Sequence, residues 1–493
     1  MTTAKPAAQT APNGRRTGVN RFLLTGALLL PVLLIARPGT ALVLRTRDMA
    51  GASSESQSIK IAFKELTLEN GLRVVLSEDH SAPVVAVTVY YDVGSRNETK
   101  GRTGFAHLFE HMMYQGSENV GKDEYFKYIE NNGGDLNGTT HVDYTDYYEV
   151  LPSNRLALAL WLESDRMRSL KITRENLDNQ RQAVEEEKRL SIDNQAYWPE
   201  LDQMDQMVFH NWAFGHSTFG SMQDLEAATV GDVKQFFDAY YIPGNAVLAV
   251  CGDLDLPDTE ALVRRYFGSI PPHQAPPAVD VSEGPGVARH KSVAVDAHAD
   301  VPEIVMAWKI PARRSQESYA IALLKAIASD GESCRLYQSL VKKKALALSV
   351  QAALEEQRGP SQMYIQIVHK NEIKPEQIES AVIAEVDRIK RLGVTNEELI
   401  RVKNQYRLAR FVGGEEGRNL QTPIGRAMAL AEFTLFDGDP SLINTEIDRY
   451  MAVTADQIQN VARKYLVPAN NSVLYIRTPQ KKTWASGNRR RPA

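Results

Sequence analysis

Cysteine is scarce in this chain, which has only Cys251 and Cys334 among its 493 residues. Two cysteines allow one disulfide at most. These two lie far apart in the sequence, and nothing around them indicates that a disulfide forms. Two buried thiols are the simpler interpretation. A fold held together by several disulfides is excluded, and a chain of this length can bury a sizeable core in two to four domains.

The chain also lacks a basic stripe or a basic run interleaved with aromatic residues. Nucleic acid is therefore not an expected partner. The three arginines at 489–491 are more simply part of a solvated tail. Charged residues make up 24% of the sequence, and the formal net charge is −4.

Acidic residues are absent from positions 1–41, which carry five basic ones. The apolar run at 22–36 is too short for a membrane span of about 20 residues but suits a signal peptide. We predict cleavage after Ala41, export to the periplasm or cell envelope, and a formal net charge that changes from −4 to −9 as the five positive charges are lost. An uncleaved membrane anchor is the alternative. A mitochondrial presequence is less favoured, because such segments are amphipathic.

Two pairs of motifs recur along the chain. Thr173 and Thr395 each precede an amphipathic helix, whereas Thr229 and Thr454 each precede a helix, a Tyr–Pro–Asn turn and an apolar strand. The members of the two sets lie 56 and 59 residues apart. Matching motifs at matching separation indicate two homologous halves.

Strands that group as hairpins, followed by pairs of helices, predict an α+β fold in which each half is a mostly antiparallel sheet with helices packed on it. A Pro- and Gly-rich segment separates the halves and reads as a linker. The predicted divisions are a signal peptide or membrane anchor at 1–41, an N-terminal half at 58–269, the linker at 270–286, a homologous C-terminal half at 287–480 and a basic tail at 481–493.

The segment GFAHLFEHMMYQGSENV, residues 104–120, carries the clearest chemistry. In a helix, His107 and His111 share one face, so both imidazoles can bind one metal ion. Glu110 lies beside them, where a carboxylate can accept a proton from water. Zinc suits imidazole ligands, and the order HxxEH is a metallopeptidase signature.

A surface cluster without metal is the alternative interpretation of these three residues. Their neighbours are apolar, however, and burying polar side chains among them costs several kcal/mol unless the side chains are paired or bind an ion. A third protein ligand is then required. Glu185, Glu186 and Glu187 compete for this place, and helix geometry favours Glu187, which lies about 60° from the apolar line through Leu177 and Val184.

These motifs resemble the pitrilysin family of zinc peptidases, which includes insulin-degrading enzyme, mitochondrial processing peptidase and bacterial relatives. The similarity extends over roughly residues 60–480 and includes NGGDLNGTTHVDYTDYYEV at 132–150 and GESCRLYQSL at 331–340. It implies two halves that close as a clamshell around a peptide chamber. Glu187 falls 76 positions after His111, where the family has its glutamate ligand.

The run GGDLNGTT suits the edge of a sheet, where a peptide substrate can add as another strand. The resemblance implies that this segment binds the substrate backbone, and Asn137, Gly134 and Thr139 are the candidate contacts. A plain turn residue is the alternative role for Asn137. Main-chain recognition favours short or unfolded peptides.

Two positions depart from the family pattern. Gln180 replaces a second glutamate, and could still orient the site through a hydrogen bond. Val341 and Leu348 stand where many catalytic relatives carry an Arg and a Tyr that grip the peptide. The neighbouring Lys342–Lys344 are interpreted as a solvated helix end that does not replace the Arg.

The favoured function is a zinc endopeptidase. The alternatives are a non-catalytic scaffold subunit of an envelope or respiratory complex and a metal-binding envelope protein without hydrolytic activity. A complete set of His107, Glu110, His111 and Glu187 argues against the scaffold. Glu110 argues against the metal-binding protein, because a pure binding site does not require a base beside the water. The missing Arg and Tyr predict a heterodimer, in which this chain supplies zinc and a homologous partner chain supplies the Arg–Tyr pair. A homodimer is the alternative.

Overall fold

The computed structural model describes residues 60–284, 286, 290–413 and 418–479. The predictions for positions 1–41 and 481–493 lie outside these residues. Within them, no helix is long and apolar enough to cross a membrane. Cys251 and Cys334 are both buried and unpaired, as predicted.

The first half contains a sheet of six strands with the order β1-β2-β6-β3-β5-β4. Its neighbours are antiparallel except for β2 and β6, which run parallel. The strands are β1 (Lys64–Thr67), β2 (Arg73–Glu78), β3 (Val84–Tyr91), β4 (Asp135–Thr140), β5 (Thr145–Pro152) and β6 (Ala246–Gly252). The Gly-rich strand β4 therefore lies at an edge, as its composition predicted.

The second half repeats this arrangement in a sheet of five strands with the order β7-β11-β8-β10-β9. Again one pair, β7 and β11, is parallel and the others are antiparallel. The strands are β7 (His290–Val295), β8 (Glu303–Ile310), β9 (Ala347–Glu355), β10 (Ser361–His369) and β11 (Asn471–Arg477). The predicted α+β fold with two homologous halves is confirmed.

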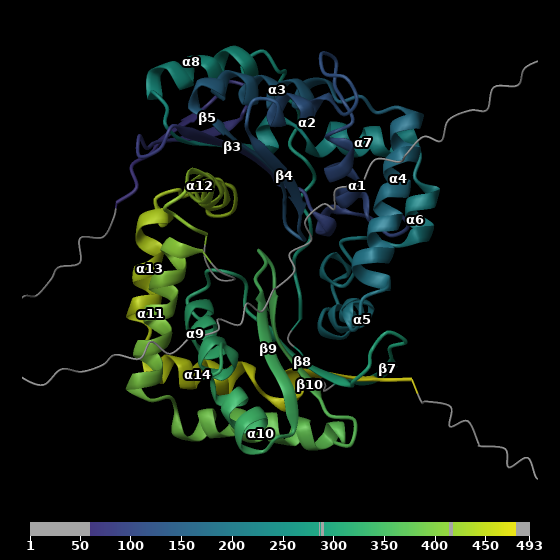
Figure 1. The fold of residues 1–493 in the computed structure, drawn as a ribbon, viewed down its shortest axis with the longest axis vertical. Coiled ribbons are helices and arrows are strands. Elements are labelled where there is room, and N and C mark those ends of the chain that lie inside the picture. Colours follow the sequence, from purple (N-terminus) through teal and green to yellow (C-terminus); the bar gives the residue numbers. More distant parts are fainter. Residues whose placement is uncertain (1–59, 285, 287–289, 414–417, 480–493) are drawn as a thin grey trace, which may run out of the picture. The chain divides into compact units, whose positions relative to one another are not determined.

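Helices surround both sheets (Figure 1). Those of the first half are α1 (Phe105–Met112), α2 (Glu124–Glu130), α3 (Leu156–Ser169), α4 (Arg174–Lys188), α5 (Trp198–Val208), α6 (Met222–Ala227), α7 (Val230–Tyr240) and α8 (Leu256–Phe267). Those of the second half are α9 (Ser318–Ser329), α10 (Pro375–Leu392), α11 (Asn396–Val412), α12 (Pro423–Asp437), α13 (Leu442–Ala452) and α14 (Ala455–Tyr465). The four repeated threonines each cap a helix by accepting a hydrogen bond from a backbone N–H in its first turn.

The inner strands β2, β3 and β6 of the first sheet carry buried apolar side chains on both faces. Val74 and Leu76 point into a core shared with the helices of their own half, whereas Val75 points into a second core. The alternation follows from the period of two in a strand. Continuous apolar strands such as AVLAVCG at 246–252 are typical of sheets covered on both sides.

Each half covers the second face of the other half's sheet. Helix α12, from the second half, packs on β3 and β6 of the first sheet through residues such as Leu430 (Figure 1). Helix α5, from the first half, packs on β8 and β11 of the second sheet through Met204 and Val208. The two halves therefore share their cores by a reciprocal exchange of helices.

One contact in this exchange opposes two carboxyl groups. Glu303 begins β8 and is buried facing Glu200 on α5, and one carboxylate oxygen of each is buried without a hydrogen-bond partner among the described residues. Burial, together with the charge of Glu200, raises the pKa of Glu303 to about 8. The pKa of Glu303 in the folded protein exceeds its pKa in the unfolded chain. The contribution of protonated Glu303 to the stability of the fold is therefore complete at low pH and is lost as the pH rises through about 8.

We predict that Glu303→Gln removes this pH dependence. The melting temperature of the variant should rise relative to the wild type between pH 6 and pH 9, by a few degrees at the upper end. Thermal unfolding at both pH values measures the difference in melting temperature. Glu226→Gln, which changes an exposed glutamate, is the control. Parallel melting profiles of wild type and Glu303→Gln would contradict the assignment.

Candidate active site

Helix α1 directs its polar residues toward strand β4 and helix α4, and buries its apolar residues in the core. Gly104, before the helix, has a φ of 81°, a backbone conformation that suits glycine. Leu108, Phe109 and Met112 are fully buried in the core of the first half. The predicted face with His107, Glu110 and His111 is thereby fixed by the packing of its neighbours.

The third candidate ligand comes from α4, which packs against α1. The Glu187 Oε2 atom lies 3.1 Å from His111 Nε2 and 3.9 Å from His107 Nε2. The ligand atoms of the three residues lie within 4.8 Å of one another, the one such group of His, Cys, Asp or Glu in the described part of the chain. Its two competitors turn toward Arg189 instead: Glu186 at 3.0 Å and Glu185 at 3.8 Å.

This donor set fits a zinc ion. Two imidazole nitrogens and one carboxylate are the composition of a catalytic zinc site that keeps a position open. Burial and the nearby His111 lower the pKa of His107 to about 4, so its ring is uncharged and able to bind a metal at neutral pH. The hydrogen bond with His111 lowers the pKa of Glu187, which favours the ionised form that a cation requires.

Glu110 is held between α1 and the edge strand. Its Oε2 atom accepts a hydrogen bond of 2.7 Å from the Thr140 hydroxyl on β4. Gly138 makes this approach possible: a Cβ atom there would lie 3.2 Å from Glu110 Cγ and 3.0 Å from Tyr147 Cδ1. Burial raises the pKa of Glu110 to about 7, against the lowering effect of the bond from Thr140. A carboxylate with such a pKa suits proton transfer near neutral pH.

The candidate peptide contacts lie on or beside β4. Asn137 is exposed in the middle of the strand, so it is not a turn residue, and its side-chain oxygen accepts a hydrogen bond of 2.9 Å from the Gly138 N–H. The Thr139 hydroxyl donates to Asp146. Gly134 precedes the strand, and a Cβ atom there would lie 2.4 Å from Leu151, so its lack of a side chain already serves packing.

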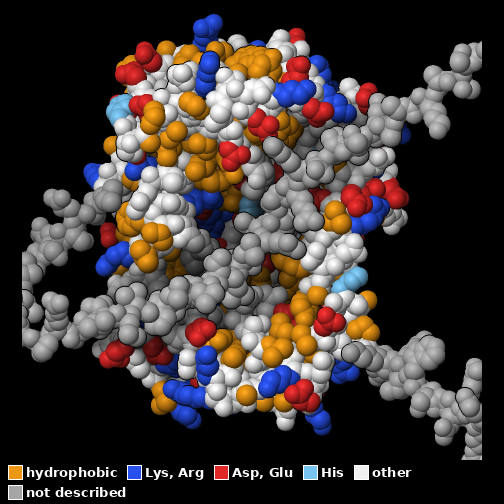
Figure 2. All heavy atoms as spheres, viewed as in Figure 1, with side chains coloured by type: hydrophobic (Ala, Val, Ile, Leu, Met, Phe, Trp, Pro, Cys, Tyr) orange, Lys and Arg blue, Asp and Glu red, His pale blue; other side chains and the backbone are white. Residues whose placement is uncertain are grey.

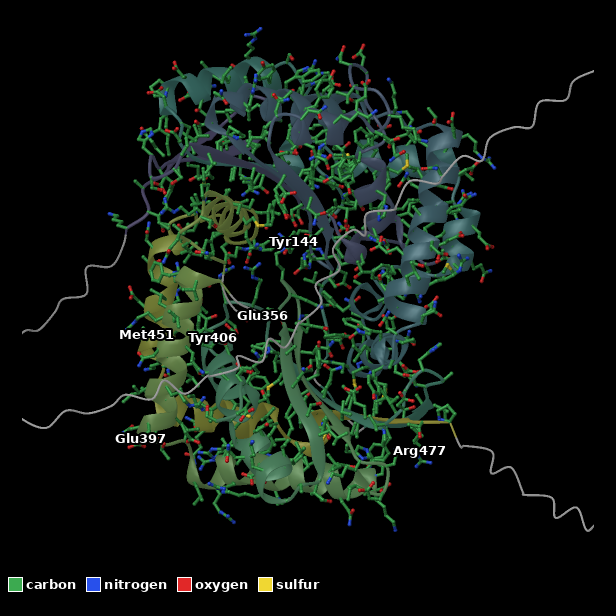
Figure 3. All side chains as sticks on the ribbon, in the orientation of Figure 1. Tyr144, Glu356, Glu397, Tyr406, Met451 and Arg477 are labelled. Carbon is green, nitrogen blue, oxygen red and sulfur yellow. The ribbon has the colours of Figure 1, made fainter. Side chains whose placement is uncertain are left out.

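A cavity of about 820 Å³ adjoins this strand. Thr139 and Thr140 are among its lining residues, and Thr140 is the residue that donates a hydrogen bond to Glu110. Both halves contribute to its wall: Tyr144 from the first, Glu356 and Tyr406 from the second (Figure 3). The space-filling view shows the surface hollowed here, with basic side chains inside (Figure 2).

Three other predicted positions lie away from the ligands. Gln180 is buried on α4, and its side-chain amide donates to Asn179 at 2.6 Å rather than to a ligand. Leu348 is 48% exposed on β9, the edge strand of the second sheet. Val341 is half-buried against the core of the second half. Neither residue carries a side chain that can donate a hydrogen bond.

Several residues around the ligands escaped the sequence analysis. Thr140 bonds Glu110, Glu98 accepts hydrogen bonds from the start of α1, and Phe219 packs on His107. Thr140 lies inside the segment that predicted the edge strand. Because neighbouring residues of a strand point to opposite faces, its alternation with Thr139 could have indicated that Thr140 faces the site. Glu98 and Phe219 lie in loops without periodicity, where nothing in the sequence pointed to them.

Two family models match the chain. The model described as Insulinase (Peptidase family M16) matches residues 73–220, and the model described as Peptidase M16 inactive domain matches residues 227–406. The chain belongs to the insulinase, or pitrilysin, family of peptidases, as its motifs suggested. The second half accordingly has no metal set in the helix that corresponds to α1, since α9 contains no His, Asp or Glu.

Individual relatives agree with this assignment. The chain is 27% identical to zinc protease PqqE of Helicobacter pylori, over 87% of this chain and 95% of the relative. It is 23% identical to the beta subunit of the mitochondrial-processing peptidase of Lentinula edodes, over 87% of this chain and 93% of the relative. Its fold is similar to the crystal structure of a protease from Helicobacter pylori, with a TM-score of 0.80 and 25% identity over 85% of this chain and 100% of that one.

The ligand geometry predicts one zinc ion per chain. Glu187→Gln should weaken zinc binding by at least about 10-fold, because the carboxylate supplies both a ligand and its charge. Competition with a chromophoric chelator measures the dissociation constant. Glu186→Gln, which changes the exposed neighbour, is the control and should bind zinc like the wild type. Equal zinc affinity in Glu187→Gln and the wild type would remove Glu187 from the ligand set.

Proposed function

We propose that this protein is a zinc-dependent endopeptidase that hydrolyses short or unfolded peptides. The observation that carries the proposal is the convergence of His107, His111 and Glu187 within 4.8 Å, with Glu110 beside them and an edge strand above. Membership of a peptidase family and similarity to proteins named zinc proteases support it. Export to the periplasm or envelope remains part of the proposal, based on residues 1–41.

Each residue has a distinct role in this proposal. His107, His111 and Glu187 hold the zinc ion, which when bound polarises the peptide carbonyl and activates water. The Glu110 carboxylate accepts the proton of the attacking water and delivers it to the departing amine nitrogen. Thr140 keeps Glu110 oriented through its 2.7 Å hydrogen bond.

The edge of β4 is the proposed peptide-binding element. It pairs with β5 on one side, and its other side has no strand partner within the described residues. A peptide added there as a further strand would pass Glu110 and run toward the cavity that begins at Thr139 and Thr140. Asn137, Thr139 and the backbone beside Gly134 are the proposed contacts.

Glu110→Gln tests the mechanism. The variant should keep zinc but lose peptidase activity by roughly 100- to 10,000-fold, the usual contribution of a general base. His107→Ala should lose both zinc and activity. Cleavage of an unfolded peptide and metal analysis of the same samples give the two readouts, and Glu118→Gln, an exposed change in the following loop, is the control. Full activity in Glu110→Gln would contradict the mechanism.

We also propose that the chain works with a second one. Leu348 and Val341 offer no hydrogen bond to a peptide, although positioning of the substrate contributes much of an enzyme's rate. The proposed partner is a homologous chain that lacks HxxEH and carries the Arg–Tyr pair, giving a heterodimer. A homodimer would have two zinc sites and no such grip.

Activity measured against concentration tests the two-chain proposal. The isolated chain should show little peptidase activity, and addition of the homologous partner should raise it strongly. A matched control adds the partner with its Arg and Tyr replaced by Val and Leu, which should bind without the gain. Full activity of the isolated chain at every concentration would rule the proposal out.

A further inference from the structure

The first turn of α1 is held by a carboxylate from outside the helix. Gly104, the N-cap residue, makes no side-chain hydrogen bond to the helix. Instead Glu98 accepts from the Gly104 N–H with Oε2 and from the Ala106 N–H with Oε1, both at 2.9 Å. A carboxylate at this end also interacts favourably with the helix dipole. The position of α1 therefore depends on Glu98.

The buried Glu98 carboxyl group is paired with His216. The Nε2 atom of His216 lies 3.2 Å from Glu98 Oε2, and its Nδ1 atom lies 2.8 Å from the carbonyl oxygen of Trp212. These two contacts hold both ring nitrogens, and burial raises the pKa of Glu98. Burial lowers the pKa of His216, but the bond and charge of Glu98 outweigh it, so that the pKa is raised overall. Stacking on the Trp212 ring at 4.0 Å fixes the imidazole plane.

The residues that follow His216 press on the same turn of α1. The Phe219 and His107 rings meet in a T-shaped arrangement, with 4.5 Å between centroids and 72° between planes. Gly220 lies so close that a Cβ atom there would be 2.3 Å from the Gly104 nitrogen. Residues 216–221 therefore connect the Glu98 carboxyl group to His107, a candidate metal ligand.

His107 has particular need of such support. Its Nδ1 atom is buried and has no hydrogen-bond partner within the described residues. Metal-binding histidines usually have their second nitrogen held by a carboxylate, a carbonyl or water, which fixes the ring. Here packing against Phe219 and the placement of α1 are what orient the ring, so both contacts bear on where Nε2 points.

We infer that Glu98 and Phe219 are positioning residues for the metal site, with His216 holding Glu98 in place. The inference rests on the proposed function, because it assumes a metal on His107, His111 and Glu187. Glu98 sets the position of the helix that carries both histidines. Phe219 sets the ring orientation of the first one.

Metal affinity and coordination geometry in the full chain provide the test. Glu98→Gln replaces one accepting oxygen with a donor, and Phe219→Leu keeps an apolar side chain but removes the aromatic ring that contacts His107. Each should raise the zinc dissociation constant by about 10- to 100-fold, the usual effect of changing a residue that orients a ligand. Each should also alter the visible absorption of the Co²⁺-substituted protein.

Glu398→Gln is the matched control. Glu398 also lies at a helix N-terminus, accepts the Thr395 N–H at 2.8 Å and pairs with Arg335 at 2.6 Å, but in the second half. This variant should lose thermal stability while keeping the zinc affinity and Co²⁺ spectrum of the wild type. Should Glu98→Gln not fold, Phe219→Leu carries the test, since it leaves the buried Glu98–His216 pair intact.

The outcomes separate the inference from the proposed function. A wild-type chain that binds neither Zn²⁺ nor Co²⁺ overturns the proposed function itself. A wild type that binds metal, with both variants binding equally tightly and giving the same spectrum, overturns the positioning role alone. Equal loss of affinity in Glu398→Gln also overturns it, because the effect would then reflect general loss of stability.

Discussion

Neither sheet of this protein can bury both of its faces with the helices of its own half. The inner strands of each sheet carry buried apolar side chains on both sides, and one side is covered by a helix that the other half supplies: α12 for the first sheet and α5 for the second. Removing either helix from its sheet would expose a continuous apolar face to water, at a cost of roughly 1.5–3 kcal/mol for each large side chain. The rest of the structure depends on this exchange.

The exchange also forms the surroundings of the candidate site. Because α12 lies against the inner face of the first sheet, residues of the second half come close to the strand that ends beside Glu110. Tyr144 stacks on Tyr90 at 5.0 Å and meets Phe436 of α12 at 5.3 Å. The cavity wall is therefore built from both halves, although every candidate metal ligand comes from the first.

Local patterns in the sequence predicted much of this arrangement. The threonine caps predicted the helix starts, and the Gly-rich run predicted the edge strand. Helical spacing paired His107 with His111, and helix geometry together with the family resemblance selected Glu187. The partner of each sheet face was not predictable, because an amphipathic helix such as α12 fits any apolar surface and nothing local selects one. Phe219 and Glu98 were missed for a similar reason, since single residues in loops acquire neighbours only through the tertiary fold.

The two halves share one fold but carry different chemistry. Helix α1 holds two histidines and a glutamate, whereas α9, at the same place in the second half, is apolar and almost fully buried. The edge strands differ in the same way, with Thr140 beside the site on β4 and Leu348 on β9. Stability explains why this asymmetry is tolerated. What the first half requires of the second is the apolar face of α12, and that requirement places no condition on polar side chains in α9 or β9. The second half is thus free to lose, or never to acquire, a metal site while it remains indispensable to the fold that supports the first.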